Sequence, residues 1–254
     1  MGVVIKAANT RAPWYAKVMP PAADTLQGWY EFGSDVKVQG FNRAMGKKNG
    51  VVIGSPTISA GYTRFKGLVN YLQTDISDTN SLTIVVVGRS ANAIPAGAAS
   101  TGDANTPFYA GFNRGNPQTP GLTGSVFGTG LYHIKPDALT SGSSRENGAG
   151  AISYYSTDLN GETPTNFALR AIRINASGLD VVSNLTRGVV ATRTTANARV
   201  RTDSLARVGS GVTGFGADVD VSCVAFWSSA LTDADLAAVG ELMRKRAARY
   251  GINV

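Results

Sequence analysis

Short apolar or alternating segments are separated by turn residues at the spacing of roughly 8–12 positions that is typical of β-sandwiches. The pattern begins near residue 24 and continues to residue 227. Asn-Gly and Ser-Gly steps between the segments supply the positive φ angles that tight hairpins require. We therefore predict short antiparallel strands, and the clearest of them are 29–32, 36–39, 51–53, 82–87, 167–174, 179–182 and 219–227.

The last of these strands has the most regular alternation. Alternate residues of a strand face opposite sides of the sheet, and Asp220 and Ser222 place polar side chains on one side at the start of this strand. The residues on the other side are predicted to face the core. These residues are Val219, Val221, Cys223, Ala225 and Trp227. Cys223 is then a small buried apolar residue, because no basic residue or second cysteine lies nearby in the sequence to make its thiol reactive.

Residues 232–250 have the pattern of an α-helix. Thr232 is the expected N-cap with Asp235 at the third helical position, and Gly251 is the expected C-cap. Acidic residues at the start and basic residues at the end agree with the helix dipole. The basic cluster at 244–249 is interpreted as a solvated helix end rather than a nucleic-acid surface. The apolar stripe of this helix is Leu236, Val239, Met243, Ala247 and Tyr250.

Residues 1–23 follow no regular period and are predicted to form an extended N-terminal arm, followed by one domain at 24–254. Prolines in the arm remove backbone donors and fix φ. Its aromatic side chains either pack onto the chain's own domain or dock on a neighbouring chain. The arm residues that we expect to bind a partner are Arg11, Trp14, Tyr15 and Lys17.

Composition and charge exclude several classes of protein. The 254 residues include 30 glycines, which favours a turn-rich all-β chain. The longest apolar run, 82–87, is far shorter than the roughly 20 residues of a membrane-spanning helix. A secretory signal is not visible, which predicts synthesis in the cytoplasm. The sequence contains one cysteine and one histidine, too few for an intrachain disulfide or for a zinc site of the usual Cys/His kind. We predict no cofactor.

The order of the motifs resembles that of laminin-G-like, concanavalin A-like jelly-roll domains. Segment 24–32, DTLQGWYEF, is similar to the opening strand of such domains. Strand 220–227, the sequence SSALTDADL at 228–236 and the helix ending in Tyr250 and Gly251 are similar to their close. The segments between these ends that keep the same order are 46–50, 51–57, 67–74 and 81–89.

This resemblance implies an all-β fold of two stacked antiparallel sheets, with a concave face and the C-terminal helix packed outside. Members of the superfamily bind glycans, bind proteins, hydrolyse polysaccharides or form parts of larger assemblies, and the fold alone does not choose between these functions. The arm, the composition rich in Gly, Ala and Thr and the lack of an export signal also resemble virion proteins of tailed bacteriophages.

Groups suited to catalysis are scarce in the sequence. Hydrolytic members of the superfamily use carboxylates two positions apart on one strand, because a retaining glycosidase needs them about 5–5.5 Å apart. Asp218 and Asp220 form the one such pair on a predicted strand, and we interpret them as a solvated edge or loop anchor. His133 would be the only base for a nucleophilic triad and is interpreted as structural. We therefore predict that the chain is not an enzyme.

Three arginines form the candidate ligand surface of the sequence. Arg199, Arg201 and Arg207 share one parity with Asp203, so a strand would project all of them from one side. Guanidinium forks suit the carboxylate of an acidic sugar or of a neighbouring chain. A solvated outer sheet face is the alternative interpretation. The net charge of +7 is spread over the whole chain, so no specific nucleic-acid binding is predicted.

Two weaker candidates concern sugars and calcium. Asp75, Asp78 and Asn80 lie in one predicted loop, where carboxylates and carbonyls would suit Ca²⁺, but their spacing is not that of an EF-hand. Tyrosines on a concave face would stack on sugar rings, although a sandwich also uses tyrosines in its core. The tyrosines considered for stacking are Tyr62, Tyr71, Tyr109, Tyr132, Tyr154 and Tyr155.

The favoured hypothesis is a non-enzymatic structural or attachment protein of a bacteriophage particle, a component of the tail, a fibre or the capsid surface. It would dock to neighbours through its arm, and its partners would be other virion proteins and further copies of the same chain. The alternative is a lectin-like module that binds a host-surface glycan through its concave face. A third hypothesis is a glycoside hydrolase that depends on Asp220.

Overall fold

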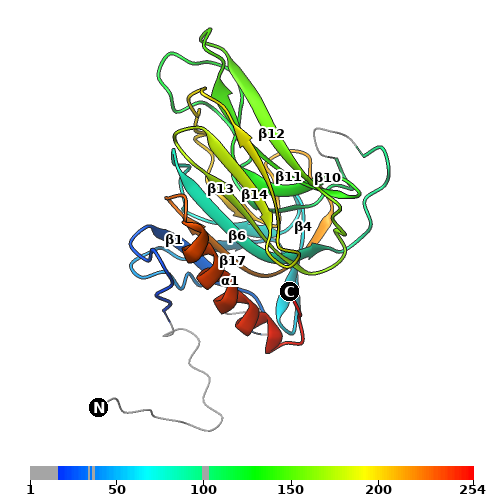
Figure 1. Cartoon of the computed structure of the whole chain (residues 1–254). Helices are drawn as coiled ribbons and strands as arrows, with labels where there is room; N and C mark the ends of the chain where they lie inside the picture. The colour runs from blue at the N-terminus through cyan, green and yellow to red at the C-terminus, as the bar shows by residue number, and fades with distance from the viewer. Residues whose placement is uncertain (1–16, 34, 36–37, 99–102) are drawn as a thin grey trace, which may run out of the picture.

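The structure is a computed structural model that describes residues 17–33, 35, 38–98 and 103–254. Within these residues the chain forms two large antiparallel sheets, one two-stranded sheet and one α-helix, α1 (Asp233–Ala248). The helix lies across the outside of the sheet that contains β6, β13 and β17 (Figure 1). The chain is therefore a β-sandwich of the jelly-roll type with a C-terminal helix, as the sequence predicts.

Sheet A, the sheet under the helix, has eight strands in the described part of the chain. Its order is β15-β14-β13-β6-β17-β4-β3, and β1 pairs with the second half of β17. The bounds are β1 Leu26–Glu31, β3 Thr57–Ser59, β4 Tyr62–Lys66, β6 Leu82–Ser90, β13 Ala168–Ile174, β14 Leu179–Asn184, β15 Val189–Thr194 and β17 Asp218–Trp227.

Sheet B forms the other layer and has seven strands among the described residues, in the order β12-β11-β10-β7-β16-β5-β2. The bounds are β2 Val51–Ile53, β5 Tyr71–Gln73, β7 Phe108–Gly111, β10 Gly130–Lys135, β11 Ala138–Glu146, β12 Ile152–Asn160 and β16 Arg207–Val208. A separate small sheet pairs β8 (Arg114–Gly115) with β9 (Val126–Phe127).

Two apolar layers hold these elements together, because each large side chain removed from water contributes roughly 1.5–3 kcal/mol. The main core lies between the sheets, where side chains of both meet. A second layer lies between sheet A and α1. Large members of the main core are Tyr30, Phe32, Phe65, Leu72, Tyr109, Leu131 and Phe226. Large members of the layer under the helix are Trp29, Trp227, Leu236 and Met243.

A β-bulge in β17 changes which side chains face which layer. The register against β6 shifts between Val221 and Cys223. Before the bulge Val221 belongs to the main core, and after it Val224 and Phe226 do, whereas Cys223 and Trp227 face α1. The predicted single parity is therefore wrong beyond Val221, because one extra residue in a strand reverses its alternation. Cys223 is buried, as predicted, and burial raises the pKa of its thiol to about 12.

The start of α1 agrees with the sequence prediction, but its C-cap is Arg249 and not Gly251. Thr232 is the N-cap, and its Oγ1 accepts a hydrogen bond of 3.1 Å from the backbone N–H of Asp235. Gly251 follows the last turn with a φ of +73°, a conformation that glycine adopts without strain. Tyr250, expected in the apolar stripe, is 46% exposed. Among the described residues no helix is long and apolar enough to cross a bilayer.

The basic end of α1 is less solvated than predicted. Arg246 is buried, and it donates hydrogen bonds to the backbone carbonyl of Phe32 and, over 2.7 Å, to the Oγ of Ser222. Arg244 donates to the carbonyls of Leu185 at 2.6 Å and Val254 at 3.1 Å. These two arginines satisfy backbone carbonyls of neighbouring segments. Lys245 and Arg249 are exposed, as predicted.

Segment 36–39 is not a strand where the structure describes it. The backbone N–H of Val38 donates to the carbonyl of Asp35 at 3.3 Å, so the chain turns there. Gln39 stabilises this turn, since its side-chain amide donates to the carbonyls of Gly33 and Asp35, both at 2.8 Å. An amide side chain that bonds to nearby carbonyls thus favours a turn where the alternation predicted a strand.

The described part of the N-terminal segment packs on its own domain from its first residue. The Nζ of Lys17 donates to the carbonyl of Asn42 at 2.8 Å and lies 4.6 Å from the ring centre of Phe41. Lys17 therefore contacts its own domain, which is one of the two alternatives for the arm. The other arm residues, Arg11, Trp14 and Tyr15, lie outside the described residues, so partner docking through them stays a prediction.

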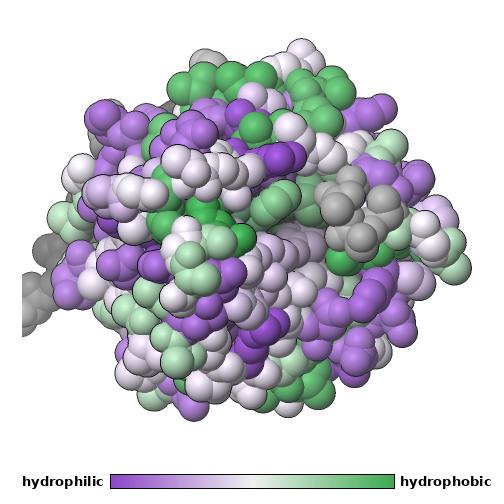
Figure 2. Space-filling view, turned by 90° about the horizontal axis from the view of Figure 1, so that it is seen from above, coloured by the Kyte–Doolittle hydropathy of each residue, from purple (hydrophilic) through white to green (hydrophobic). Residues whose placement is uncertain are grey.

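The surface mixes polar and apolar residues. Figure 2 shows that the face seen from above carries several separate hydrophobic patches among hydrophilic residues. Scattered apolar residues of this kind are usual on monomeric proteins. The shape and chemistry of individual pockets are therefore more informative about function than the overall hydropathy of this face.

Candidate functional site

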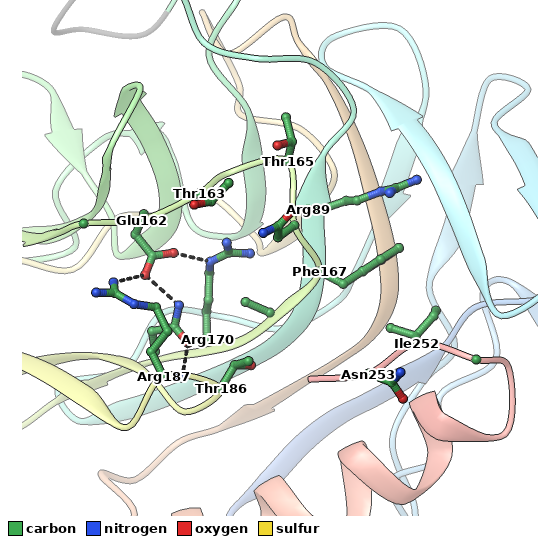
Figure 3. A pocket seen from close by; sticks show the side chains of 15 residues that line it. Arg89, Glu162, Thr163, Thr165, Phe167, Arg170, Thr186, Arg187, Ile252 and Asn253 are labelled. Carbon is green, nitrogen blue, oxygen red and sulfur yellow. Dashed lines mark hydrogen bonds and ion pairs between the residues drawn. The ribbon is translucent and has the colours of Figure 1, made fainter.

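A polar pocket with a volume of about 640 Å³ lies at the end of sheet A where β6, β13 and β14 meet. Residues of the loop 161–167, of the turn after β14 and of the segment 251–253 after α1 line it (Figure 3). We call it the arginine pocket. Its charged lining residues are Arg89, Glu162, Arg170 and Arg187.

Local sequence features fix the walls of the arginine pocket. Gly161 has a φ of +77°, and a Cβ there would lie 2.9 Å from the Nη2 of Arg187, too close for a real side chain. The carbonyl of Pro164 accepts from the backbone N–H of Ser90 at 2.8 Å and ties the loop to β6. The Oγ1 of Thr186 accepts from the backbone N–H of a β13 residue at 2.8 Å. The pocket is therefore built into the sheet edge.

Glu162 is the buried centre of the hydrogen-bond network in this pocket (Figure 3). Its Oε2 accepts from the Nε of Arg170 at 3.0 Å, and its Oε1 accepts from the Nδ2 of Asn184 at 2.6 Å and the Nη1 of Arg187 at 3.3 Å. Burial alone raises the pKa of Glu162, but the charge of Arg170 and the hydrogen bonds from Arg170 and Asn184 outweigh burial and hold this pKa at about 2. The carboxylate is therefore ionised at neutral pH.

The lining of the pocket has an excess of positive charge. Three guanidinium groups and one carboxylate line it, a formal net charge of +2. Asp220 offsets part of this charge, because its Oδ2 accepts from the Nε of Arg89 at 2.8 Å. The Arg187 side chain is 39% exposed, and only its Nη1 bonds to protein acceptors in the described structure. Its other N–H groups suit a carboxylate, since a guanidinium offers five donors in a planar fork.

The remaining lining residues are mostly uncharged and polar. Thr163, Thr165, Asn166 and Asn253 contribute hydroxyl and amide groups. Phe167 contributes an aromatic ring, and the guanidinium of Arg89 lies 4.6 Å from its centre (Figure 3). A site that combines arginines, hydroxyls and amides is chemically suited to a small anion that carries hydroxyl groups.

His133 is buried next to this network, as its structural interpretation predicts. Its Nε2 lies 3.8 Å from the Oε2 of Glu162, longer than a hydrogen bond, and its ring packs edge-on against Tyr109. Burial lowers the pKa of His133 to about 4 in the folded protein. The ring is therefore neutral at physiological pH, and it does not line the arginine pocket.

We expect His133 to make the protein sensitive to mild acid. The unfolded chain binds a proton at this side chain below about pH 6.5, but the folded protein does so only near pH 4. The neutral His133 therefore contributes fully to the free energy of unfolding above pH 6.5. This contribution, on the order of 3 kcal/mol, is lost as the pH falls toward 4. Urea unfolding at pH 7.5 and pH 4.5 should show a smaller loss for His133→Gln than for the wild type. Equal losses in both proteins would contradict this assignment.

The structure does not form the arginine row that the sequence predicts. Only Arg207 lies in a strand, β16, and Arg199 is joined to sheet B by an isolated bridge. Arg199 is buried, where its Nη2 donates to the Oδ1 of Asp78 at 2.6 Å. Arg207 donates to Gln73 at 2.9 Å. Arg201 is partly exposed, so the three side chains do not share one strand face.

Asp220 of the aspartate pair and both aspartates of the candidate calcium loop form ion pairs within the protein. Asp220 is buried rather than solvated, and its carboxylate bridges Arg64 at 2.7 Å and Arg89 at 2.8 Å. Asp78 pairs with the buried Arg199, whereas Asp75 forms an exposed pair with a lysine. Among the described residues no group of three or more His, Cys, Asp or Glu side chains is placed to hold a metal ion.

The six candidate tyrosines have three kinds of environment. Tyr109 is fully buried in the main core and is not available for stacking. Arginine side chains lie over the rings of three more, namely Tyr62, Tyr71 and Tyr155. Tyr132 and Tyr154 line an aromatic cavity on sheet B. Tyr132 and Tyr154 were thus both candidates from the sequence. The sequence did not indicate that they lie in the same cavity.

Sequence reasoning missed the arginine pocket. Its charged residues come from the end of β6, the loop after β12, the strand β13 and the turn after β14. One signal was present, because Arg170 lies among apolar residues of a largely buried strand and so requires a buried acidic partner. Glu162 is that partner, eight residues earlier in the chain.

No protein-family model matches the sequence, and no curated protein matches it. Solved structures do match in fold. The chain is similar to the botulinum neurotoxin serotype D binding domain, with a TM-score of 0.57 and 11% identity over 87% of this chain and 52% of that one. It is also similar to a serotype D ligand binding domain in complex with N-acetylneuraminic acid, with a TM-score of 0.56 and 12% identity over the same shares.

A mutant Trypanosoma rangeli sialidase with trans-sialidase activity is a further similar structure, with a TM-score of 0.57 and 9% identity over 91% of this chain. The chain spans about half the length of the neurotoxin chains and 34% of the sialidase chain. At these identities the likeness establishes the fold alone. The protein is a β-sandwich domain of the jelly-roll class.

Proposed function

We propose that this chain is a non-enzymatic, lectin-like module that binds a carboxylate-bearing sugar in the arginine pocket. The observation that carries the proposal is the partly exposed Arg187, which lines a pocket together with two further arginines and several hydroxyl and amide groups. An arginine fork binds a carboxylate through two parallel hydrogen bonds, and the neighbouring polar groups pair with sugar hydroxyls.

Two further observations support the proposal. Structures with the same fold are described as binding domains, and one of them is in complex with N-acetylneuraminic acid, which is a carboxylate-bearing sugar. The formal charge of +2 in the lining favours a single anionic group over a neutral ligand. We also propose that the pocket does not hydrolyse the sugar. A glycosidase normally uses two carboxylates, and the described lining of the pocket contains one.

The test is binding of sialylated and matched asialo oligosaccharides by calorimetry. We expect the wild type to prefer the sialylated form, and Arg187→Ala to weaken its binding about 10–100-fold, because charge-assisted hydrogen bonds contribute about 1.5–3 kcal/mol. Arg187→Lys should recover only part of the affinity, since lysine lacks the planar fork.

Arg201→Ala is the matched control, because it removes the same charge at a partly exposed position outside the pocket. It should leave the affinity unchanged. Loss of binding in Arg201→Ala but not in Arg187→Ala would move the site to the surface predicted from the sequence. Equal affinity for sialylated and asialo sugars would reject the proposal, and so would hydrolysis of either one.

We propose further that the module serves attachment in a bacteriophage particle, with other virion proteins and copies of itself as partners. The sequence resemblance supports this proposal, whereas Lys17, a residue of the predicted arm, contacts its own domain and lends the docking role no support. Mass spectrometry of purified particles should detect the chain in stoichiometric amounts. Its absence from such particles would reject a virion role and leave the sugar-binding proposal standing.

A further inference from the structure

A second cavity, separate from the arginine pocket, lies on the outer face of sheet B and has a volume of about 240 Å³. Strand alternation explains its lining. Tyr109 and Leu131 face the main core, so Phe108 and Tyr132 face the opposite side and form a separate apolar cluster with Phe215. We call it the aromatic cavity. Its aromatic lining residues are Phe108, Phe112, Phe127, Tyr132, Tyr154 and Phe215.

The rings of this cavity offer both faces and edges to a flat ligand. Phe108 and Tyr132 are nearly parallel, with an interplanar angle of 7°, whereas Phe215 meets both of them at about 60°. Aromatic pairs favour such offset and edge-on arrangements. Tyr154 is 37% exposed, so the wall of the cavity reaches the protein surface. A ring-shaped ligand can therefore enter and pack against several of these rings.

Asn113 supplies an unpaired hydrogen-bond acceptor in the same cavity. It is only 5% exposed, and its Oδ1 is buried without a hydrogen-bond partner in the described structure. A buried polar atom without a partner is costly, by about 1–3 kcal/mol, unless a ligand or water supplies the missing bond. This atom thus indicates a ligand that carries a hydrogen-bond donor.

The tyrosine pair defines the other polar feature of the cavity. The hydroxyls of Tyr132 and Tyr154 are 2.5 Å apart, so one donates to the other. Burial raises the pKa of both phenols, which keeps them protonated and uncharged. The lining contains no charged side chain among the residues that the structure describes. The cavity therefore suits a neutral ligand.

We propose that the aromatic cavity binds a small neutral aromatic alcohol or amine of the phenol or indole class, whose single O–H or N–H donates to the Oδ1 of Asn113. The volume is below the range of about 300–1,000 Å³ that is typical of pockets for drug-sized ligands, which limits the ligand to one or two rings. A sugar ring does not fit this chemistry, because its many hydroxyls would outnumber the polar partners in the cavity.

The test compares p-cresol with toluene, which differ by one hydroxyl, in calorimetry and ligand-observed NMR on the full chain. We expect the wild type to bind p-cresol about tenfold more tightly than toluene, because only p-cresol satisfies Asn113. Asn113→Leu, which has similar volume and no acceptor, should bind the two compounds equally. Asn105→Leu, at an exposed position outside the cavity, should keep the tenfold preference.

The comparison of two ligands within each protein remains informative even where a variant is less stable. Failure of the wild type to bind p-cresol, or an equal affinity for p-cresol and toluene, would overturn the proposal. So would competition between p-cresol and a neutral methyl glucoside for the cavity. None of these results bears on the arginine pocket, whose test uses sialylated sugars and Arg187 variants.

Discussion

Replacing Asp78 with alanine should lower the free energy of unfolding by about 3–5 kcal/mol, because it leaves the guanidinium of Arg199 buried without its counter-charge. Both side chains are at most 1% exposed, and the Oδ1 of Asp78 accepts from the Nη2 of Arg199 at 2.6 Å. The Oδ2 also accepts from the backbone N–H of Thr202 at 3.1 Å. Urea unfolding followed by tryptophan fluorescence measures the loss.

The same loop provides a matched control for this substitution. Asp75 pairs with Lys48 at 2.9 Å, but both side chains are more than half exposed. Asp75→Ala should therefore cost less than about 1 kcal/mol. A double variant, Asp78→Leu with Arg199→Met, should recover most of the stability, because it removes both charges together. Similar losses for Asp75→Ala and Asp78→Ala would contradict the buried pair.

Trp227→Ala should lower the free energy of unfolding by about 3–5 kcal/mol, the range for truncation of a large buried aromatic side chain. Trp227 is 1% exposed in the layer between sheet A and α1, and it packs edge-on against Trp29 with ring centres 6.2 Å apart. Its Nε1 also donates to the carbonyl of Pro21 at 3.3 Å. For a chain of this size the melting temperature should fall by roughly 6–20 °C.

Trp227→Phe and Met45→Ala are the controls for that measurement. Phenylalanine keeps a ring against Trp29 and loses only the indole N–H and part of the area, so the cost should be clearly smaller than for alanine. Met45 is 62% exposed, and its truncation should stay within about 0.5 kcal/mol. A change below about 1 kcal/mol in Trp227→Ala would show that the helix does not depend on this residue for its packing.

Many strands can be predicted from the sequence, because a strand with one buried face shows an alternation of apolar and polar residues. The predicted strands at 51–53, 82–87 and 179–182 lie within β2, β6 and β14, and the helix at 232–250 differs from α1 only at its ends. The bulge at Val221 was not predictable, since a shift of one residue is set by the neighbouring strand. Segment 36–39 failed for a different reason, because the Gln39 side chain bonds to the carbonyls of Gly33 and Asp35 and stabilises a turn.

The candidate site was harder to predict, because its charged residues come from separate strands and loops, and Arg89 pairs with Asp220, 131 positions away. A net charge of +7 suggests solvated arginines, yet Arg145, Arg170 and Arg199 are buried and paired with Asp180, Glu162 and Asp78. The pair of Arg199 and Asp78 joins positions 121 residues apart. Periodicity shows which face of a strand a residue occupies, but not which carboxylate lies opposite it.

The burial of Cys223 has a practical consequence for the study of this domain. It is the only cysteine in the sequence, it is 0% exposed beside the bulge of β17, and its thiol is protonated at neutral pH. A maleimide reagent can then modify the chain only when the sandwich opens, so the speed of modification reports how often opening occurs. The native sequence thus carries its own label site, and each variant above can be ranked by labelling kinetics without an engineered probe.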